Sequence, residues 1–146
     1  MAADRIAEAT WEGNLAQGQG RIDLKSSGLA TGMPVTWASR TEEPGGKTSP
    51  EELLAAAHAS CFAMAMSHQL AGAGHTPERL HVRATATFDK VGDGFRVTSV
   101  RLHVRGRVPG ADEAAFMKAA NAAKDGCPIS QALKGNVDIS LEAMLE

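Results

Sequence analysis

Residues 48–70 of the chain read TSPEELLAAAHASCFAMAMSHQL. Ser49 ahead of Pro50 is typical of a helix N-cap followed by a proline at the first helical position, and Glu52 completes a capping-box pattern. Gly72 follows the stretch closely and supplies a stop signal. The pattern therefore predicts a helix of about twenty residues.

Apolar and small side chains lie on every side of this predicted helix, so no broad polar face is left for water. Such a helix is buried, either in a protein core or in a membrane. Polar residues such as Glu51, His58 and Ser67 interrupt the run, and a membrane span would need about eighteen or more apolar residues. We therefore predict a central helix buried in protein, with Cys61 in its middle and a second helix packed against its alanines.

The composition favours one domain over residues 1–146 and a core of small aliphatic side chains, because the chain has no Tyr, four Phe and two Trp. A thin core around an apolar helix suggests obligate dimerisation. The formal net charge of −2 indicates neither a nucleic-acid partner nor an anionic membrane surface. Residues 1–5 are charged and lack an apolar segment, so we expect a cytoplasmic location.

The chain has two cysteines, Cys61 and Cys127. In a reducing compartment they are poor candidates for a structural disulfide, and their spacing matches no zinc motif. The histidines are too scattered to indicate a metal site. Reactive thiols and inert core residues remain as the two alternatives.

Alternating apolar and polar residues predict strands over residues 7–12, 22–24, 33–40, 80–89, 95–104 and 137–141. The alternation changes phase near Thr98 and Ser99, which predicts a β-bulge. Asp112 caps a further helix, and a short helix runs through Leu133. The resulting order, βββ-α-ββ-αα-β, predicts an α+β fold with antiparallel pairing around the central helix.

A basic stripe of Arg101, His103, Arg105 and Arg107 lies on one face of the predicted strand 95–104 and its continuation. A solvated sheet face is its ordinary interpretation, since surface charge usually serves solubility. Anion binding is the alternative.

Local features favour Cys127 over Cys61 as the attacking thiol. Cys61 lies in an apolar helix, where desolvation raises a thiol pKa unless a cation stands nearby. Cys127 precedes Pro128 and so sits at a helix N-terminus, whose N–H groups favour a thiolate. Glu51 has a simple explanation too, because acidic residues collect at helix N-termini.

Three segments carry a family resemblance: TSPEEL at 48–53, AHASCF at 57–62 and GCPIS at 126–130. They resemble the signature segments of the OsmC/Ohr family of organic hydroperoxide reductases. Residues 11–20 and 77–94 also resemble the OsmC branch, so the resemblance covers nearly the whole chain. His58, where Ohr-type members usually carry tyrosine, favours the OsmC branch as well.

The resemblance implies a thiol peroxidase that works without metal, haem or flavin. In the family, the helix cysteine is peroxidatic and the Cys-Pro cysteine resolves it, which maps onto Cys61 and Cys127. A thiolate at Cys61 attacks the peroxide, and the sulfenic acid condenses with Cys127 to an intramolecular disulfide. We expect Arg40 to be the activating cation, held in a two-point grip by Glu51, with Arg21 as the reserve candidate.

The implied partners are an organic hydroperoxide, a small dithiol or lipoyl-protein reductant, and a second copy of the chain. Glu51 and Cys61 are ten residues apart, which is about 15 Å along a straight helix. We therefore predict an intertwined two-fold homodimer in which Cys61 and Cys127 of one chain meet Glu51 and Arg40 of the other. A peroxide-sensing redox switch and a binding protein for apolar ligands are the alternative functions.

Two further side-chain sets have open interpretations. His58 lies one turn before Cys61, where it either tunes the thiol or is a satisfied interface histidine. Phe62, Met64 and Met66 either line a channel for an alkyl peroxide or belong to the core.

Overall fold

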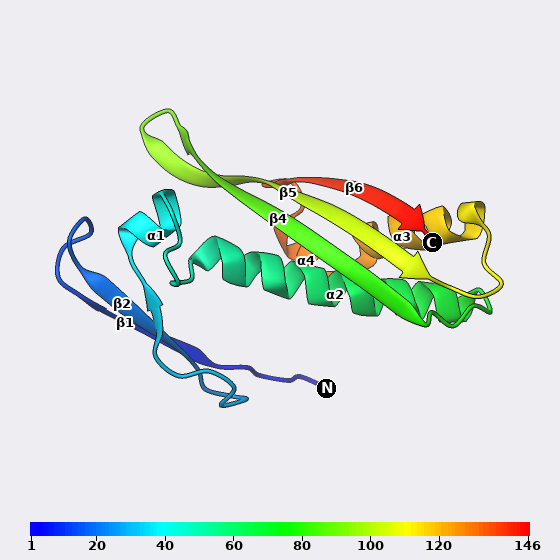
Figure 1. Cartoon of the computed structure of the whole chain (residues 1–146), viewed down its shortest axis with the longest axis horizontal. Coiled ribbons are helices and arrows are strands. Elements are labelled where there is room, and N and C mark those ends of the chain that lie inside the picture. Colours follow the sequence, from blue (N-terminus) through cyan, green and yellow to red (C-terminus); the bar gives the residue numbers. More distant parts are fainter. The chain divides into compact units, whose positions relative to one another are not determined.

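The helices and strands follow one another along the chain in the order β1 (Ala7–Glu12), β2 (Gln19–Leu24), β3 (Met33–Val35), α1 (Trp37–Thr41), α2 (Pro50–Gly72), β4 (Arg79–Val91), β5 (Gly94–Arg107), α3 (Glu113–Gly126), α4 (Pro128–Leu133) and β6 (Asp138–Leu145) (Figure 1). The computed structural model describes residues Met1–Glu146 and divides into two units, Met1–Leu53 and Leu54–Glu146. The α+β class is confirmed. The expectation of a single domain stays a prediction. No helix is long and apolar enough to cross a membrane.

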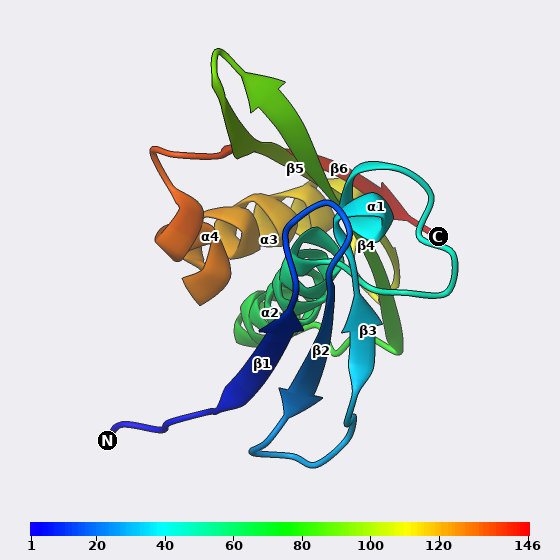
Figure 2. The ribbon, with the colours of Figure 1, turned by 90° about the vertical axis from the view of Figure 1, so that its left-hand side faces the viewer.

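The first unit contains a three-stranded antiparallel sheet in the order β1-β2-β3, whose strands lie side by side in Figure 2. Gly20 is buried at its centre, because Trp11 of β1 and Val35 of β3 cross directly over it. A Cβ atom at Gly20 would lie 2.8 Å from Trp11 Cε3 and 2.9 Å from Val35 Cγ1. Every residue of β1 is nevertheless exposed within the chain, so one strand of this sheet has little cover.

Helix α1 replaces the end of a predicted strand. The alternation of Met33, Val35 and Trp37 predicts extended chain as far as Arg40, and this prediction is wrong beyond Val35. The Thr36 hydroxyl accepts the Ser39 N–H at 3.0 Å, and the Ser39 hydroxyl accepts the Thr36 N–H at 2.9 Å. This capping box starts a helix one residue after the strand ends, and Arg40 therefore sits in the last turn of a helix.

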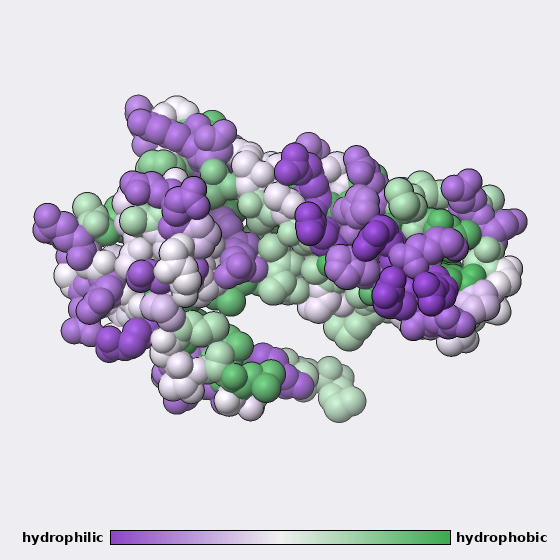
Figure 3. All heavy atoms as spheres, viewed as in Figure 1, coloured by the Kyte–Doolittle hydropathy of each residue, from purple (hydrophilic) through white to green (hydrophobic).

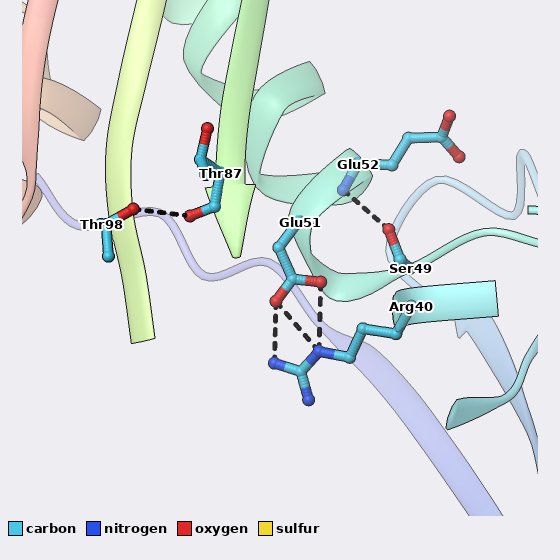
Figure 4. Close-up of polar contacts among 6 residues, drawn as sticks. All are labelled: Arg40, Ser49, Glu51, Glu52, Thr87 and Thr98. Carbon is cyan, nitrogen blue, oxygen red and sulfur yellow. Dashed lines mark hydrogen bonds and ion pairs between the residues drawn. The ribbon is translucent and has the colours of Figure 1, made fainter. Parts of the chain in front are cut away.

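Helix α2 spans 23 residues, close to the predicted length. Its N-cap is confirmed, because the Ser49 hydroxyl accepts the Glu52 N–H at 3.1 Å (Figure 4). The reciprocal half of the capping box differs from the prediction. The Glu52 carboxylate accepts a hydrogen bond from the Thr48 hydroxyl at 2.7 Å instead.

The second unit contains the sheet β4-β5-β6, with β5 in the middle. The predicted bulge is confirmed: Thr87 pairs with Ser99 and Phe88 with Val97, which leaves Thr98 as the extra residue. The Thr98 hydroxyl donates to the Thr87 carbonyl at 3.5 Å (Figure 4).

Strand β6 runs parallel to β5, whereas antiparallel pairing was expected. The connection between the two strands explains the difference. Parallel neighbours need a crossover of a dozen or more residues, and α3 and α4 provide it.

The core of this unit lies between one face of the sheet and the helices. Its buried side chains include Phe62, Met66, Leu70, Val100, Leu102, Val104, Phe116, Ala119, Ala120 and Ala123. Phe116 of α3 presses against the sheet at Gly106, where a Cβ atom would lie 2.8 Å from Phe116 Cζ. Small residues on α3 and a glycine in β5 therefore let the layers approach closely.

Burial along α2 is confined to one stripe within a single chain. His58, Phe62, Met66 and Leu70 recur every four residues and are all 0% exposed. On the remaining surface, Met64 is 68% exposed. The exposed positions of α2 combine Met64 and several alanines with the polar residues Glu52, Ser60, His68 and Gln69, so part of its exposed surface is apolar.

The other face of the second sheet carries the basic stripe, and hydrophilic side chains gather over β4 and β5 in Figure 3. Arg101, His103 and Arg105 of the stripe, with neighbours from β4 and β6, line a hollow of about 670 Å³. Arg101, Arg105 and Arg107 are exposed, as expected for a solvated face. The anion-binding alternative stays a prediction.

Candidate active site

The two thiols lie side by side although they are far apart in the sequence. Cys61 comes from the middle of α2 and Cys127 from the junction of α3 and α4. Both are free, and the Cys127 thiol donates to Cys61 Sγ at a sulfur–sulfur distance of 2.9 Å. A disulfide has a bond length of about 2.05 Å, so a movement of less than about 1 Å would join them.

Main-chain hydrogen bonds on both sides fix Cys127. Its N–H donates to the Ala123 carbonyl at 2.9 Å and so closes the last turn of α3. Its carbonyl accepts the Gln131 N–H at 2.9 Å and so opens α4, which begins with Pro128. The end of one helix and the start of the next thus hold this cysteine, as the Cys-Pro pair predicts.

The two cysteines differ in exposure. Cys127 is 0% exposed, whereas Cys61 is partly exposed and opens into a hollow of about 400 Å³. The hollow is lined by Cys61, Met64, Ala65, His68, Gln69, Ala122, Ala123, Gly126 and Pro128. A peroxide can therefore reach Cys61 more readily than Cys127, which is the reverse of what local sequence features favour. Of the three apolar side chains considered for a channel, Met64 lines the hollow, and Phe62 and Met66 are core.

Burial raises the pKa of the Cys61 thiol above its ordinary value, and the hydrogen bond and charge of Cys127 act in the same direction. A backbone hydrogen bond from Ile129 lowers it in part. The net effect favours the protonated thiol. Cys61 therefore needs a nearby cation if it is to react as a thiolate at neutral pH.

Arg40 and Glu51 form the predicted two-point ion pair in the first unit (Figure 4). Arg40 Nη2 donates to Glu51 Oε1 at 2.8 Å, and Arg40 Nε lies 3.0 and 3.1 Å from the two carboxylate oxygens. The guanidinium also lies over the Trp37 ring, 5.9 Å from its centroid. The side chain of Glu51 is only 9% exposed, so the guanidinium is held by a nearly buried carboxylate.

Arg21, the reserve candidate, has a different partner. It pairs with Glu12 at 3.0 Å across β1 and β2, and both side chains are more than half exposed. Exposed pairs of this kind are weakly held. The geometry therefore favours Arg40 as the positioned guanidinium.

His58 is buried beside the thiols and bonds to a residue that sequence reasoning missed. Its Nε2 lies 2.7 Å from the Ser130 hydroxyl, which is also buried. Its Nδ1 is buried without a partner, and burial lowers the pKa of the imidazole. The signal for Ser130 was its place in the Gly126–Ser130 segment, three residues after Cys127.

No group of three or more His, Cys, Asp or Glu side chains is placed so that it could hold a metal ion. The second unit thus brings two thiols together, with the bonded pair of His58 and Ser130 in its interior, and the first unit carries a guanidinium–carboxylate pair.

Comparison with known proteins matches residues 43–142 to the family described as OsmC-like protein. The chain is 38% identical to Peroxiredoxin OsmC of Escherichia coli (strain K12), over 97% of this chain and 98% of that protein. The crystal structure of the organic hydroperoxide resistance protein OhrB of Bacillus subtilis matches with a TM-score of 0.71 at 25% identity, over 94% of this chain and 97% of that one. An OsmC-like protein from Mycoplasma pneumoniae shares the fold, with a TM-score of 0.75 at 15% identity over 99% of both chains. The chain therefore belongs to the OsmC-like protein family.

Proposed function

We propose that this protein is a cysteine-based peroxidase that reduces organic hydroperoxides to alcohols. One observation carries the proposal: a partly exposed thiol, Cys61, lies 2.9 Å from a fully buried thiol, Cys127. Such a reaction needs one accessible sulfur that attacks the peroxide and a second, buried sulfur that then forms a disulfide with it. The names of relatives, a peroxiredoxin and an organic hydroperoxide resistance protein, support the same chemistry.

The reaction has two steps at sulfur. The Cys61 thiolate attacks one peroxide oxygen, the O–O bond breaks, and the alkoxide leaves and takes a proton to become the alcohol. The resulting Cys61 sulfenic acid is attacked by Cys127, which forms the disulfide and releases water. A dithiol then restores both thiols by exchange and becomes a disulfide itself. The reductant is a small dithiol or a lipoyl protein, in a cytoplasmic setting that keeps both cysteines reduced at rest.

The activating guanidinium comes from a second copy of the chain. Glu51 and Cys61 are ten residues apart on α2, and at 1.5 Å rise per residue this is about 15 Å along the axis. The exposed strand β1 and the exposed Met64 side of α2 call for a covering partner. In a two-fold homodimer of this single-domain chain, the Arg40–Glu51 pair of one subunit stands beside Cys61 and Cys127 of the other.

The hollow at Cys61 favours hydroperoxides with an apolar group, of the fatty or aryl kind. Met64, Ala65, Ala122 and Ala123 supply apolar lining, and His68 and Gln69 lie at its polar side. Transfer of an alkyl or aryl group from water to such a surface is favourable because of the hydrophobic effect.

Steady-state consumption of cumene hydroperoxide with dithiothreitol as the reductant tests the function. The wild type should turn over, and Cys61→Ser should not. A redox switch would be oxidised once and then turn over poorly with every dithiol. A binding protein for apolar ligands would bind cumene hydroperoxide equally well without either cysteine. Equal peroxide consumption by the wild type and Cys61→Ser would rule out the proposed function.

A further inference from the structure

We propose that His58 and Ser130 form a latch that holds α4 in register on α2 and so keeps Cys127 within reach of Cys61. The latch is the hydrogen bond between the His58 imidazole and the Ser130 hydroxyl. Both are positioning residues, because they touch neither sulfur in the reaction and act through the segment that carries Cys127. The inference rests on the proposed function, since it concerns the disulfide-forming step.

The His58–Ser130 and Cys61–Cys127 contacts join the same two segments of the chain. His58 precedes Cys61 by three residues on α2, and Ser130 follows Cys127 by three residues. The contacts His58–Ser130 at 2.7 Å and Cys61–Cys127 at 2.9 Å therefore lie about one helical turn apart along the same pair of segments. A slip of α4 by one turn would move it by about 5.4 Å and break both contacts together.

The latch is buried and specific. His58 is 0% exposed and Ser130 is 4% exposed. The stripe of α2 that contains His58 continues with the apolar residues Phe62 and Met66, so an apolar side chain would meet the packing needs of the position. A polar ring whose Nδ1 has no partner is costly there. Its one polar contact is made to α4, which indicates that this contact is the function of the histidine.

Helix α4 needs such support. It has six residues, which is too short to be stable without tertiary contacts. Its N-cap, Cys127, makes no side-chain capping bond. Gln131 ties α4 back to the Asp125 carbonyl near the end of α3. Cys61 contacts the start of this segment through the Cys127 thiol and the Ile129 N–H, and Ser130 adds a buried side-chain hydrogen bond from α4 to α2.

The latch affects which of two reactions the oxidised Cys61 undergoes. Its sulfenic acid can condense with the Cys127 thiol, which forms the disulfide and releases water. It can also react with a second hydroperoxide, which gives a sulfinic acid and one alcohol. Holding Cys127 close favours the first reaction. Cys127 does not react in the first peroxide attack on Cys61, so loss of the latch should slow disulfide formation far more than this attack.

The test compares Ser130→Ala, Ser130→Thr and His58→Phe with the wild type, and uses Ser140→Ala on the exposed side of β6 as the matched control. Reduced protein receives cumene hydroperoxide in single-turnover experiments. Peroxide consumption reports the first step, and intact mass after thiol blocking reports disulfide and sulfinic acid. We expect Ser130→Ala and His58→Phe to consume the first equivalent at close to the wild-type rate and to form the disulfide about tenfold more slowly, with more sulfinic acid. Ser130→Thr keeps the hydroxyl and should behave as the wild type, as should Ser140→Ala.

The double variant His58→Phe/Ser130→Ala should be no slower than either single variant, because the first change already breaks the hydrogen bond. Disulfide formation at the wild-type rate in Ser130→Ala would overturn the proposal, and so would an equal slowing of both steps. Ser130→Ala decides the matter even if His58→Phe does not fold.

A second measurement needs no peroxide. The equilibrium between dithiol and disulfide is measured in mixtures of reduced and oxidised dithiothreitol. The latch predicts that Ser130→Ala needs about tenfold less reduced dithiothreitol, relative to its oxidised form, to open the Cys61–Cys127 disulfide. An unchanged equilibrium contradicts the latch. If the wild type consumed no peroxide, the proposed function would fail, and this equilibrium would still decide on the latch.

Discussion

The Arg40 guanidinium is held to the Glu51 carboxylate through two nitrogens, with Nη2 at 2.8 Å and Nε at 3.0 Å from Oε1. Such a pair fixes the plane of the guanidinium as well as its position. Glu51 lies in the first turn of α2 and Arg40 in the last turn of α1, so two helix ends set the direction in which the cation points.

Arg40→Met should therefore slow peroxide attack by about 10²–10³-fold, as loss of a positioned charge at a reacting centre does. In this variant the Cys61 pKa should lie above the ordinary value of a thiol, because burial raises it and no guanidinium opposes that effect. Titration of the thiolate absorbance in the ultraviolet, with Cys127→Ser as background, measures the pKa.

Arg40→Lys and Arg21→Met are the controls for this prediction. The lysine keeps the charge and loses the two-point grip, so its rate should lie between those of the wild type and Arg40→Met. Arg21→Met should keep nearly full activity, because Arg21 forms an exposed pair with Glu12. The opposite ranking of Arg21→Met and Arg40→Met would transfer the role to Arg21.

The order of the two thiols gives a separate prediction. Cys61→Ser should abolish the reaction with peroxide, whereas Cys127→Ser should react once and then accumulate sulfenic acid or over-oxidise. Dimedone labelling followed by peptide mass mapping locates the sulfenic acid. Label on Cys127 in the Cys61→Ser variant would reverse the assignment and would mean that the N-terminus of α4 activates the attacking thiol.

Stability should fall at mildly acidic pH because of His58. Burial lowers the pKa of this imidazole in the folded protein below its ordinary value of 6.5. The unfolded chain then binds the proton more readily, so stability is fully present above about pH 6.5 and is lost as the pH falls toward the lower, folded-state pKa. Urea unfolding of the wild type and His58→Phe at pH 7.5 and 5.5 measures the effect. The wild type should lose more of its free energy of unfolding between these pH values, and equal losses would contradict the prediction.

Local patterns predicted the elements whose signals are local. Ser49 as a cap and Thr98 as a bulge follow from side-chain type and from a phase change within one strand. Helix α1 was not predicted, because the alternation of Met33, Val35 and Trp37 continues across Thr36. The capping role of Thr36 depends on Ser39. The direction of β6 relative to β5 was not predicted either, because the alternation of apolar and polar residues is the same in parallel and antiparallel strands.

The site shows the same division. The Arg40–Glu51 and Cys61–Cys127 pairings were expected from the family resemblance, whereas local features of the sequence favoured Cys127 as the attacking thiol. The bond between His58 and Ser130 joins residues 72 positions apart, and no periodicity within either segment indicates it. Contacts of this kind become visible only when the packing of α4 on α2 is known.

The last prediction concerns the assembly. Glu51 and Cys61 are ten residues apart in α2, about 15 Å along a straight helix, and in the proposed mechanism the guanidinium that Glu51 holds activates the thiol. If each site combines Arg40 and Glu51 of one subunit with Cys61 and Cys127 of the other, two inactive variants should complement each other. Cys61→Ser lacks the thiol but keeps the ion pair, and Glu51→Gln keeps the thiol but lacks the carboxylate. A heterodimer of the two contains one intact site and one doubly defective site.

Mixing the two proteins under subunit exchange should therefore restore up to about a quarter of the wild-type activity, because half of the dimers are mixed and each mixed dimer has one working site. Native mass spectrometry measures the fraction of heterodimers, and cumene hydroperoxide consumption measures the recovery. Mixing Cys61→Ser with Cys127→Ser is the control, because both of these residues belong to the same half of the site and neither heterodimer site is complete. Heterodimers that form in the expected amount and show no activity would mean that each site is built within one chain.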